Sequence, residues 1–98
     1  MYICLMLTTT AIVTIERPAR YAKQLAAHMG HKIESSEIEN GWQLAFPSGV
    51  ATLICTDETL TMTVKANDAE SQERMQFALD KHLRQFTTKL PDYDITWL

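Results

Sequence analysis

The three histidines of this chain are its residues best suited to chemistry near neutral pH, and they lie in two short stretches with helical patterns. His28 and His31 fall within residues 20–32, and His82 falls within residues 79–86. An imidazole can bind a transition metal or transfer a proton near neutral pH. Two helices packed side by side on a sheet would bring His82 towards His28. The sequence therefore raises the question of whether the histidines share one site.

Three interpretations of the histidines stay open at this point. A three-histidine site would suit zinc or ferrous iron, with an open coordination position for water or substrate. Gly30 lies between His28 and His31, and we expect it to end the helix in a left-handed conformation that loosens their spacing. In the structural alternative, His82 packs beside an apolar stripe and His31 complements the helix dipole. The third alternative is a site for an organic anion.

The first predicted helix is basic, in a chain whose formal net charge is -3. Between positions 17 and 32 the sequence has four basic residues and no acid, whereas acids collect in residues 34–39, 57–58 and 68–73. Such a helix would attract a small anion or an acidic partner, unless it is only a solvated face. The candidate ligand-binding residues are His28, His31, His82, Arg20 and Lys32, and the first three are the candidate metal ligands.

Other catalytic chemistry has little support. The serines have no elbow-like glycine context, and Cys55 lies in a strand-like run without a nearby base. The sequence has no phosphate loop and no dinucleotide fingerprint. Trp42, Phe46 and Trp97 alternate along predicted strands and are expected to form core or groove walls. We therefore expect no catalytic residue and no resident cofactor, and zinc or iron is the metal that the histidines would take.

Size and composition predict one soluble globular domain over residues 1–98. Apolar residues make up 46% and charged residues 21% of the chain. The negative net charge argues against nucleic-acid binding, and no apolar run approaches the ~18 residues of a membrane span. Residues 1–6 form a candidate N-terminal extension, because Met6 offers a second start, and they lack the features of a signal peptide. A cytoplasmic location follows, and Cys4 and Cys55 are too few for a disulfide framework.

Hydrophobic periodicity predicts two helices and several antiparallel strands. Pro18 suits the first turn of one helix, and residues 67–70 form an N-cap with an acidic residue at N3 of the other. Asn40-Gly41 predicts a hairpin with a type I′ turn, which needs positive φ at both residues. The expected strands are residues 8–15, 33–39, 42–46, 50–56, 59–65 and 94–98, and the expected helices are residues 18–29 and 68–87. The order β-α-β-β-β-β-α-β predicts an α+β two-layer sandwich, with both helices on one face of an antiparallel sheet.

Several segments together resemble the bacterial family DUF2218, a domain of unknown function. They cover residues 8–98 and are Thr10-Ala11, Arg20-Tyr21, Gln24-Leu25, His28-Met29-Gly30-His31-Lys32, Phe46-Pro47-Ser48-Gly49, Leu60-Thr61-Met62, Asn67-Asp68-Ala69, His82-Leu83-Arg84-Gln85-Phe86 and Ile95-Thr96-Trp97. The resemblance implies a small stand-alone bacterial protein without established activity. Some relatives are fused to, or encoded beside, proteins resembling siderophore-interacting ferric reductases, which implies a link to iron handling. The chain departs from the family at its N-terminal extension and at Ala27, where a polar residue is expected.

These observations predict a binding or accessory module, with an iron- or siderophore-related ligand, rather than an enzyme. The first alternative is a structural or interaction protein that forms a homodimer. Its exposed edges would be the apolar segment of residues 2–7 and the short last strand. The second alternative is an enzyme that uses His82 as general base. The identity of the ligand and the oligomeric state do not follow from the residues.

Overall fold

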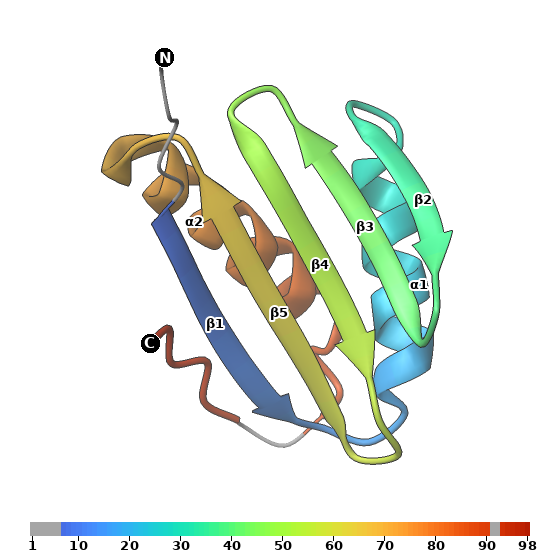
Figure 1. Ribbon diagram of the computed structural model, residues 1–98. Helices are drawn as coiled ribbons and strands as arrows, with labels where there is room; N and C mark the ends of the chain where they lie inside the picture. Colours follow the sequence, from blue (N-terminus) through green and yellow to red (C-terminus); the bar gives the residue numbers. More distant parts are fainter. Residues whose placement is uncertain (1–6, 91–92) are drawn as a thin grey trace.

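Five segments of alternating apolar and polar residues form one antiparallel sheet in the computed structural model, which describes residues 7–90 and 93–98 (Figure 1). Their order across the sheet is β1-β5-β4-β3-β2, so β1 lies beside the last strand of the meander. The predicted alternation of strands is confirmed, and the bounds shift by one or two residues. The strands are β1 (Leu7–Thr14), β2 (Glu34–Ile38), β3 (Gly41–Phe46), β4 (Gly49–Cys55) and β5 (Thr59–Ala66).

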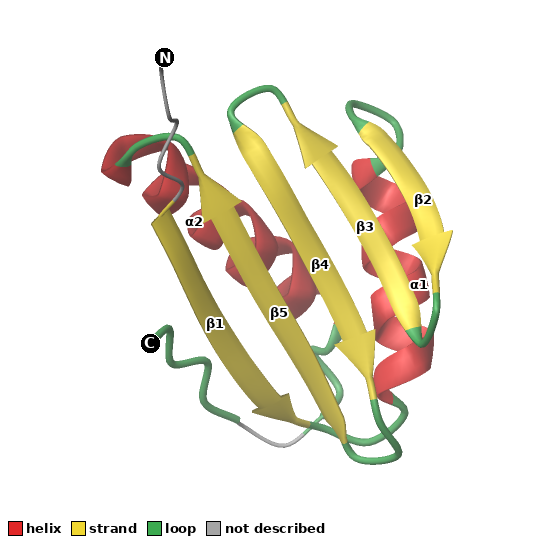
Figure 2. Ribbon diagram, in the orientation of Figure 1, coloured by secondary structure: helices red, strands yellow, loops and turns green. Residues whose placement is uncertain are grey.

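Two amphipathic helices, α1 (Pro18–Met29) and α2 (Ala69–Phe86), cover one face of this sheet, so the predicted two-layer α+β sandwich is confirmed (Figures 1 and 2). Helix α1 packs mainly on β3 and β4, and α2 packs on β5. The core between the layers is aliphatic. Its largest fully buried side chains are Leu25, Leu44, Leu53, Leu60, Met62, Leu79, Leu83, Val13 and Val64. Neither helix of the described residues is long and apolar enough to cross a membrane.

The start of α2 is fixed by a side-chain cap. The Asp68 carboxylate accepts a hydrogen bond of 2.8 Å from the Ser71 backbone N–H, which satisfies one of the donors left free at a helix N-terminus. Hydrogen bonds at the carboxylate lower the pKa of Asp68. The predicted cap therefore exists, with Asp68 as the capping residue and Glu70 in the first turn. At the other helix, Pro18 occupies the first turn as predicted.

Two expectations about glycine are wrong. Gly30 has φ -61° and ψ -14°, so α1 ends without a left-handed residue. The hairpin between β2 and β3 exists, but its turn is centred on residues 39–40, and only Asn40 has positive φ, at 62°. Gly41 already belongs to β3. A Cβ at Gly41 would lie 1.7 Å from the Leu53 carbonyl oxygen, so the residue is glycine because β4 approaches closely.

The C-terminal segment forms a single bridge to the sheet instead of the expected strand. Trp97 pairs with Ala11 of β1 in an antiparallel bridge, the Leu98 N–H donates to the Thr10 carbonyl, and the Thr9 hydroxyl donates to the Leu98 carbonyl. These bonds cover part of the β1 edge, at residues 9–11. The expectation for residues 1–6, including the start at Met6 and the thiol of Cys4, lies outside the described residues.

Candidate functional site

The end of helix α1 determines the place of His28. Helix α1 buries Ala22, Leu25, Ala26 and Met29 on its sheet-facing side. His28 lies in the last turn, beside this buried stripe, and its residue surface remains exposed. A cationic imidazole there complements the negative end of the helix dipole. The sequence of α1 therefore keeps His28 at the boundary between the helix layer and solvent.

Helix α2 brings a second imidazole to His28. Leu79 and Leu83 are fully buried, which directs His82 and Phe86 to the side of α2 that borders α1. The ring centroids of His28 and His82 are 4.4 Å apart, with an angle of 51° between the ring planes. The His28 ring also meets Phe86 edge-on, with centroids 5.6 Å apart. Side-by-side packing of the helices thus brings together two histidines separated by 54 positions in the chain.

A hydrogen bond orients the His82 ring. Its Nδ1 lies 3.4 Å from the Oε1 of Gln85, one turn further along α2. When Nδ1–H is the donor, the lone pair of the neutral ring is on Nε2. His82 therefore has one nitrogen engaged within its own helix and a second that can serve a ligand.

The surroundings of the pair are electropositive. Loss of hydration where the ring contacts its neighbours, followed by the positive charges of His82, His31 and Lys32, lowers the pKa of His28 below its usual value of 6.5. His31 and Lys32 lie in the turn after α1, where their backbone N–H groups donate to His28 and Met29. Three of the predicted ligand-binding residues, His31, Lys32 and His82, thus act electrostatically on a fourth, His28, and His82 is in ring contact with it.

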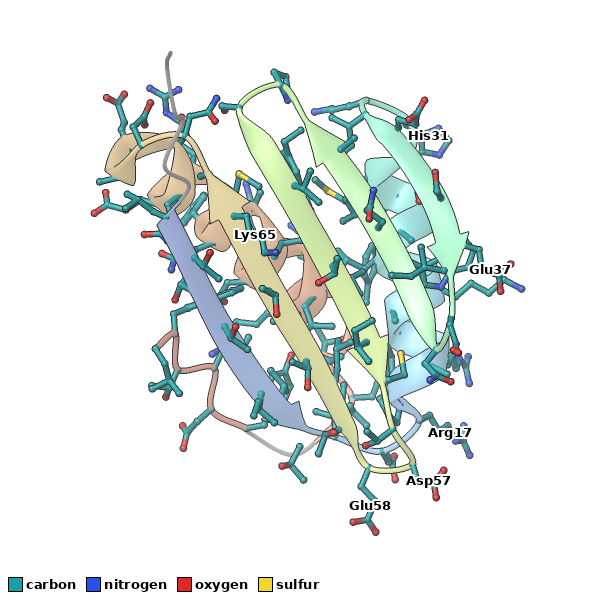
Figure 3. All side chains as sticks on the ribbon, viewed as in Figure 1. Arg17, His31, Glu37, Asp57, Glu58 and Lys65 are labelled. Carbon is teal, nitrogen blue, oxygen red and sulfur yellow. The ribbon has the colours of Figure 1, made fainter. Side chains whose placement is uncertain are left out.

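Arg20 is the predicted residue that the fold leaves apart. It precedes His28 by eight residues on α1, which corresponds to about 12 Å along a helix axis. Figure 3 likewise shows His31 and the basic residue Arg17 at opposite ends of the molecule. The basic residues of α1 are therefore distributed along the helix, and only the C-terminal end of α1 adjoins the histidine pair.

The histidine pair lacks the ligand set of a structural metal centre. No group of three or more histidine, cysteine or acidic side chains among the described residues is arranged to hold a metal ion. The nearest acid along α2, Asp80, forms a 2.6 Å ion pair with Arg84 instead. Two imidazoles could bind a metal only with its remaining positions open, whereas clustered cationic groups suit an anion.

Sequence reasoning did not locate a groove between α1 and the β2–β3 hairpin, which lies apart from the histidine pair. Its volume is about 690 Å³. Trp42 forms part of its wall, in agreement with the expectation for that residue. Cys55 also lines the groove, and burial raises the pKa of its thiol. Lys23 and Glu37 line it from opposite elements. The sequence signals for this region were the expected wall residue Trp42 and the exposed acids of β2 opposite the basic α1.

Comparison with known proteins gives a family and a solved structure. Residues 10–98 match the model of a family described as "Uncharacterized protein conserved in bacteria (DUF2218)". The chain is also similar to PA4090 from Pseudomonas aeruginosa, whose structure was determined by NMR. Sequence identity is 26%, the TM-score is 0.81, and the match covers 95% of this chain and 96% of that protein. No curated protein matches.

Proposed function

The chain belongs to the DUF2218 family of uncharacterised bacterial proteins, and we propose that it is a small binding module whose ligand is an anion held at the histidine pair. The observation that supports this proposal is the 4.4 Å contact between the His28 and His82 rings beside the further cations His31 and Lys32. Holding like charges together costs free energy, and a bound anion would remove that cost.

The chemistry of the pair sets the pH range of binding. A bound anion stabilises the imidazolium form, so binding raises the pKa of His28 and is itself strengthened as pH falls. The module would therefore bind at mildly acidic pH and release its ligand as pH rises. An anionic iron chelate of the siderophore type is one ligand of this class, and the iron link rests on the family resemblance alone.

A titration with citrate, a simple multivalent anion, tests the proposal. We expect the imidazole ¹H signals of His28 and His82 to shift at pH 6, with a Kd of about 1 mM or tighter, and to shift less at pH 8. The variants His28→Gln and His82→Gln should each weaken binding, since an uncharged amide replaces an imidazole that can be protonated. Arg20→Gln is the matched control, because Arg20 also lies on α1 but far from the pair.

Three results would contradict the proposal. One is the absence of any shift at 10 mM citrate, and another is equal loss of affinity in Arg20→Gln, which would mean attraction by the whole basic helix. The third is submillimolar binding of Zn²⁺ alone, lost in His28→Gln, without any binding of citrate. That outcome would identify the pair as a metal site.

A further inference from the structure

The face of the sheet opposite the helices, called the open face here, carries side chains in ordered rows. Figures 1 and 2 view the sheet from this side, with both helices behind it. The register aligns residues of all five strands across the sheet. The first row is Thr8, Lys65, Val50, Ala45 and Glu34, the second is Thr10, Thr63, Thr52, Gln43 and Ser36, and the third is Ile12, Thr61, Ile54, Gly41 and Ile38. The rows are thus charged, hydroxyl- and amide-bearing, and mainly apolar, respectively.

Lys65 and Glu34 are the two charged residues on the open face among the strand residues that the structure describes. They belong to the same row, with Val50 and Ala45 between them. Three strand spacings separate them, about 14 Å, so they do not pair within one chain. Lys65 stands on the viewed face of β5 in Figure 3. Lys65 and Glu34 are equally far from the line between β4 and β3, and opposite charges in this arrangement can be satisfied by a two-fold axis along that line.

We propose that the open face packs against the same face of a second copy of this chain, around a two-fold axis parallel to the strands and between β3 and β4. This axis places Lys65 of one protomer opposite Glu34 of its partner, and the symmetry gives the pair twice. Each row then meets its own equivalent: charged on charged, hydroxyl on hydroxyl and apolar on apolar. The interface is isologous, as closed dimers require.

Side-chain sizes match across the same axis. Strand β4 of one protomer lies over β3 of the other, so Val50 faces Ala45 and Ile54 faces Gly41. A large side chain therefore meets a small or absent one at both positions, as in the interdigitated core of two aligned sheets about 10 Å apart. The glycine at position 41, required within the chain by the approach of β4, would also leave room for a partner's isoleucine.

An in-plane axis perpendicular to the strands would not give this match. It would reverse the order of the rows and lay the charged row over the apolar row of the partner. Glu34 would then face Ile38 and Lys65 would face Thr61 of the partner, so both charges would be desolvated without a partner charge, which is unfavourable. The charge pattern thus selects one of the two in-plane axes.

The area of the open face is compatible with a weak dimer. Four overlapping strands are about 19 Å wide, and six residues, the length of β3, are about 20 Å long, so the projected area is about 400 Å² per copy. Side-chain relief raises the accessible area towards the ~600 Å² per copy at the lower end of stable interfaces. We therefore expect association with a Kd in the micromolar range, roughly 10–500 μM.

Sedimentation equilibrium over a range of protein concentrations, with charge-swap variants, tests the proposal. The wild-type chain should form a dimer, and Lys65→Glu or Glu34→Lys alone should weaken it about tenfold or more, because each swap creates two like-charge contacts. The double variant Lys65→Glu/Glu34→Lys should restore the wild-type Kd. Both residues are exposed, so these variants should fold as the wild type does.

A matched pair of isoleucine variants tests the position of the axis. Ile54→Lys should abolish the dimer, since Ile54 lies over the partner's β3. Ile12→Lys makes the same change in the same row, but on β1, which extends beyond the four overlapping strands, so the dimer should persist. Ile12 is 59% exposed. A wild-type chain that is monomeric at 1 mM would overturn the proposal, and so would a dimer indifferent to the charge swaps.

Discussion

Replacing Gly41 with alanine should destabilise the protein by several kcal/mol, although the change adds one methyl group. The new Cβ would lie 1.7 Å from the carbonyl oxygen of Leu53 and 2.8 Å from its carbonyl carbon. Real Cβ contacts are essentially never closer than 3.0 Å, so β3 and β4 must separate by at least about 1.3 Å. The neighbouring bond from the Cys55 N–H to the Asn40 carbonyl, now 2.8 Å, would stretch beyond hydrogen-bonding distance.

The cost follows from these displacements. Strain from one excess methyl group in a tightly packed region is about 1–3 kcal/mol, and each lost hydrogen bond adds about 0.5–1.5 kcal/mol. We expect a total of about 2–4 kcal/mol, measured by urea denaturation followed by circular dichroism. For a domain of this size, that loss corresponds to a fall in Tm of roughly 10–30 °C.

Gly30→Ala is the control, because Gly30 lies in the right-handed region at φ -61°. An alanine Cβ there would meet the Ala26 carbonyl oxygen at 3.2 Å, which needs an adjustment of a few tenths of an ångström. The free energy of unfolding should stay within about 1 kcal/mol of wild type, since alanine also restricts the unfolded chain. Wild-type stability in Gly41→Ala, or a larger loss in Gly30→Ala than in Gly41→Ala, would refute the reasoning.

Three further predictions concern titratable groups. The pKa of His28, measured by ¹H NMR, should lie below 6.5 and should rise in His82→Gln, which removes a neighbouring cation; an unchanged pKa would contradict the electrostatic account. Because the folded-state pKa is lowered, His28 binds fewer protons in the folded than in the unfolded protein, so its contribution to stability is lost as pH falls below 6.5. Asp68→Ala should lower Tm at pH 7 more than Asp68→Asn does, because asparagine retains an oxygen for the Ser71 N–H. The Tm difference between Asp68→Ala and the wild type should shrink as pH falls below about 3.8. The Cys55 thiol should react with iodoacetamide at pH 8 more slowly in the folded protein than in urea, because burial raises its pKa; equal rates would contradict its placement.

The sheet and helices could be predicted because their periods are unambiguous. Leu60, Met62 and Val64 alternate with threonines, and all three are fully buried on the helix side of β5. Pro18 fixed the start of α1, and residues 67–70 fixed the start of α2 to within one position. These signals are local, and tertiary packing supports each of them.

The glycines could not be interpreted correctly from the sequence. Position 41 follows an asparagine, and this pair commonly forms a type I′ turn. The turn instead lies one residue earlier, with Asn40 providing the positive φ. Gly41 pairs with Ile38 of β2 and with Ile54 of β4, so it belongs to the sheet and not to the turn. Strand pairing therefore outweighed the local preference of the Asn-Gly pair for a turn.

The sequence predicted the candidate site only on the condition that the two helices pack side by side. Residue spacing showed that His82 borders the apolar stripe of α2, but not on which side α1 would pack. The sheet order decides this. Because β1 pairs with the free side of β5, at the opposite edge of the sheet from β2, α1 and α2 become neighbours. The sequence groups Arg20 with the histidines through charge alone, although eight residues, about 12 Å along the helix axis, separate it from His28. Distance along the helix axis is the quantity that a grouping by charge leaves out.

The two proposed surfaces lie on opposite layers of the molecule, and this makes them independent. The histidine pair lies on the helix layer, whereas Lys65 and Glu34 lie on the open face of the sheet. A dimer through the open face would leave both histidine pairs turned outward, so each protomer could bind its own anion. The two surfaces share no residue, so neither anion binding nor dimerisation requires the other. Loss of dimerisation in a charge-swap variant should therefore leave the affinity for citrate unchanged, and the failure of one proposal would not decide the other.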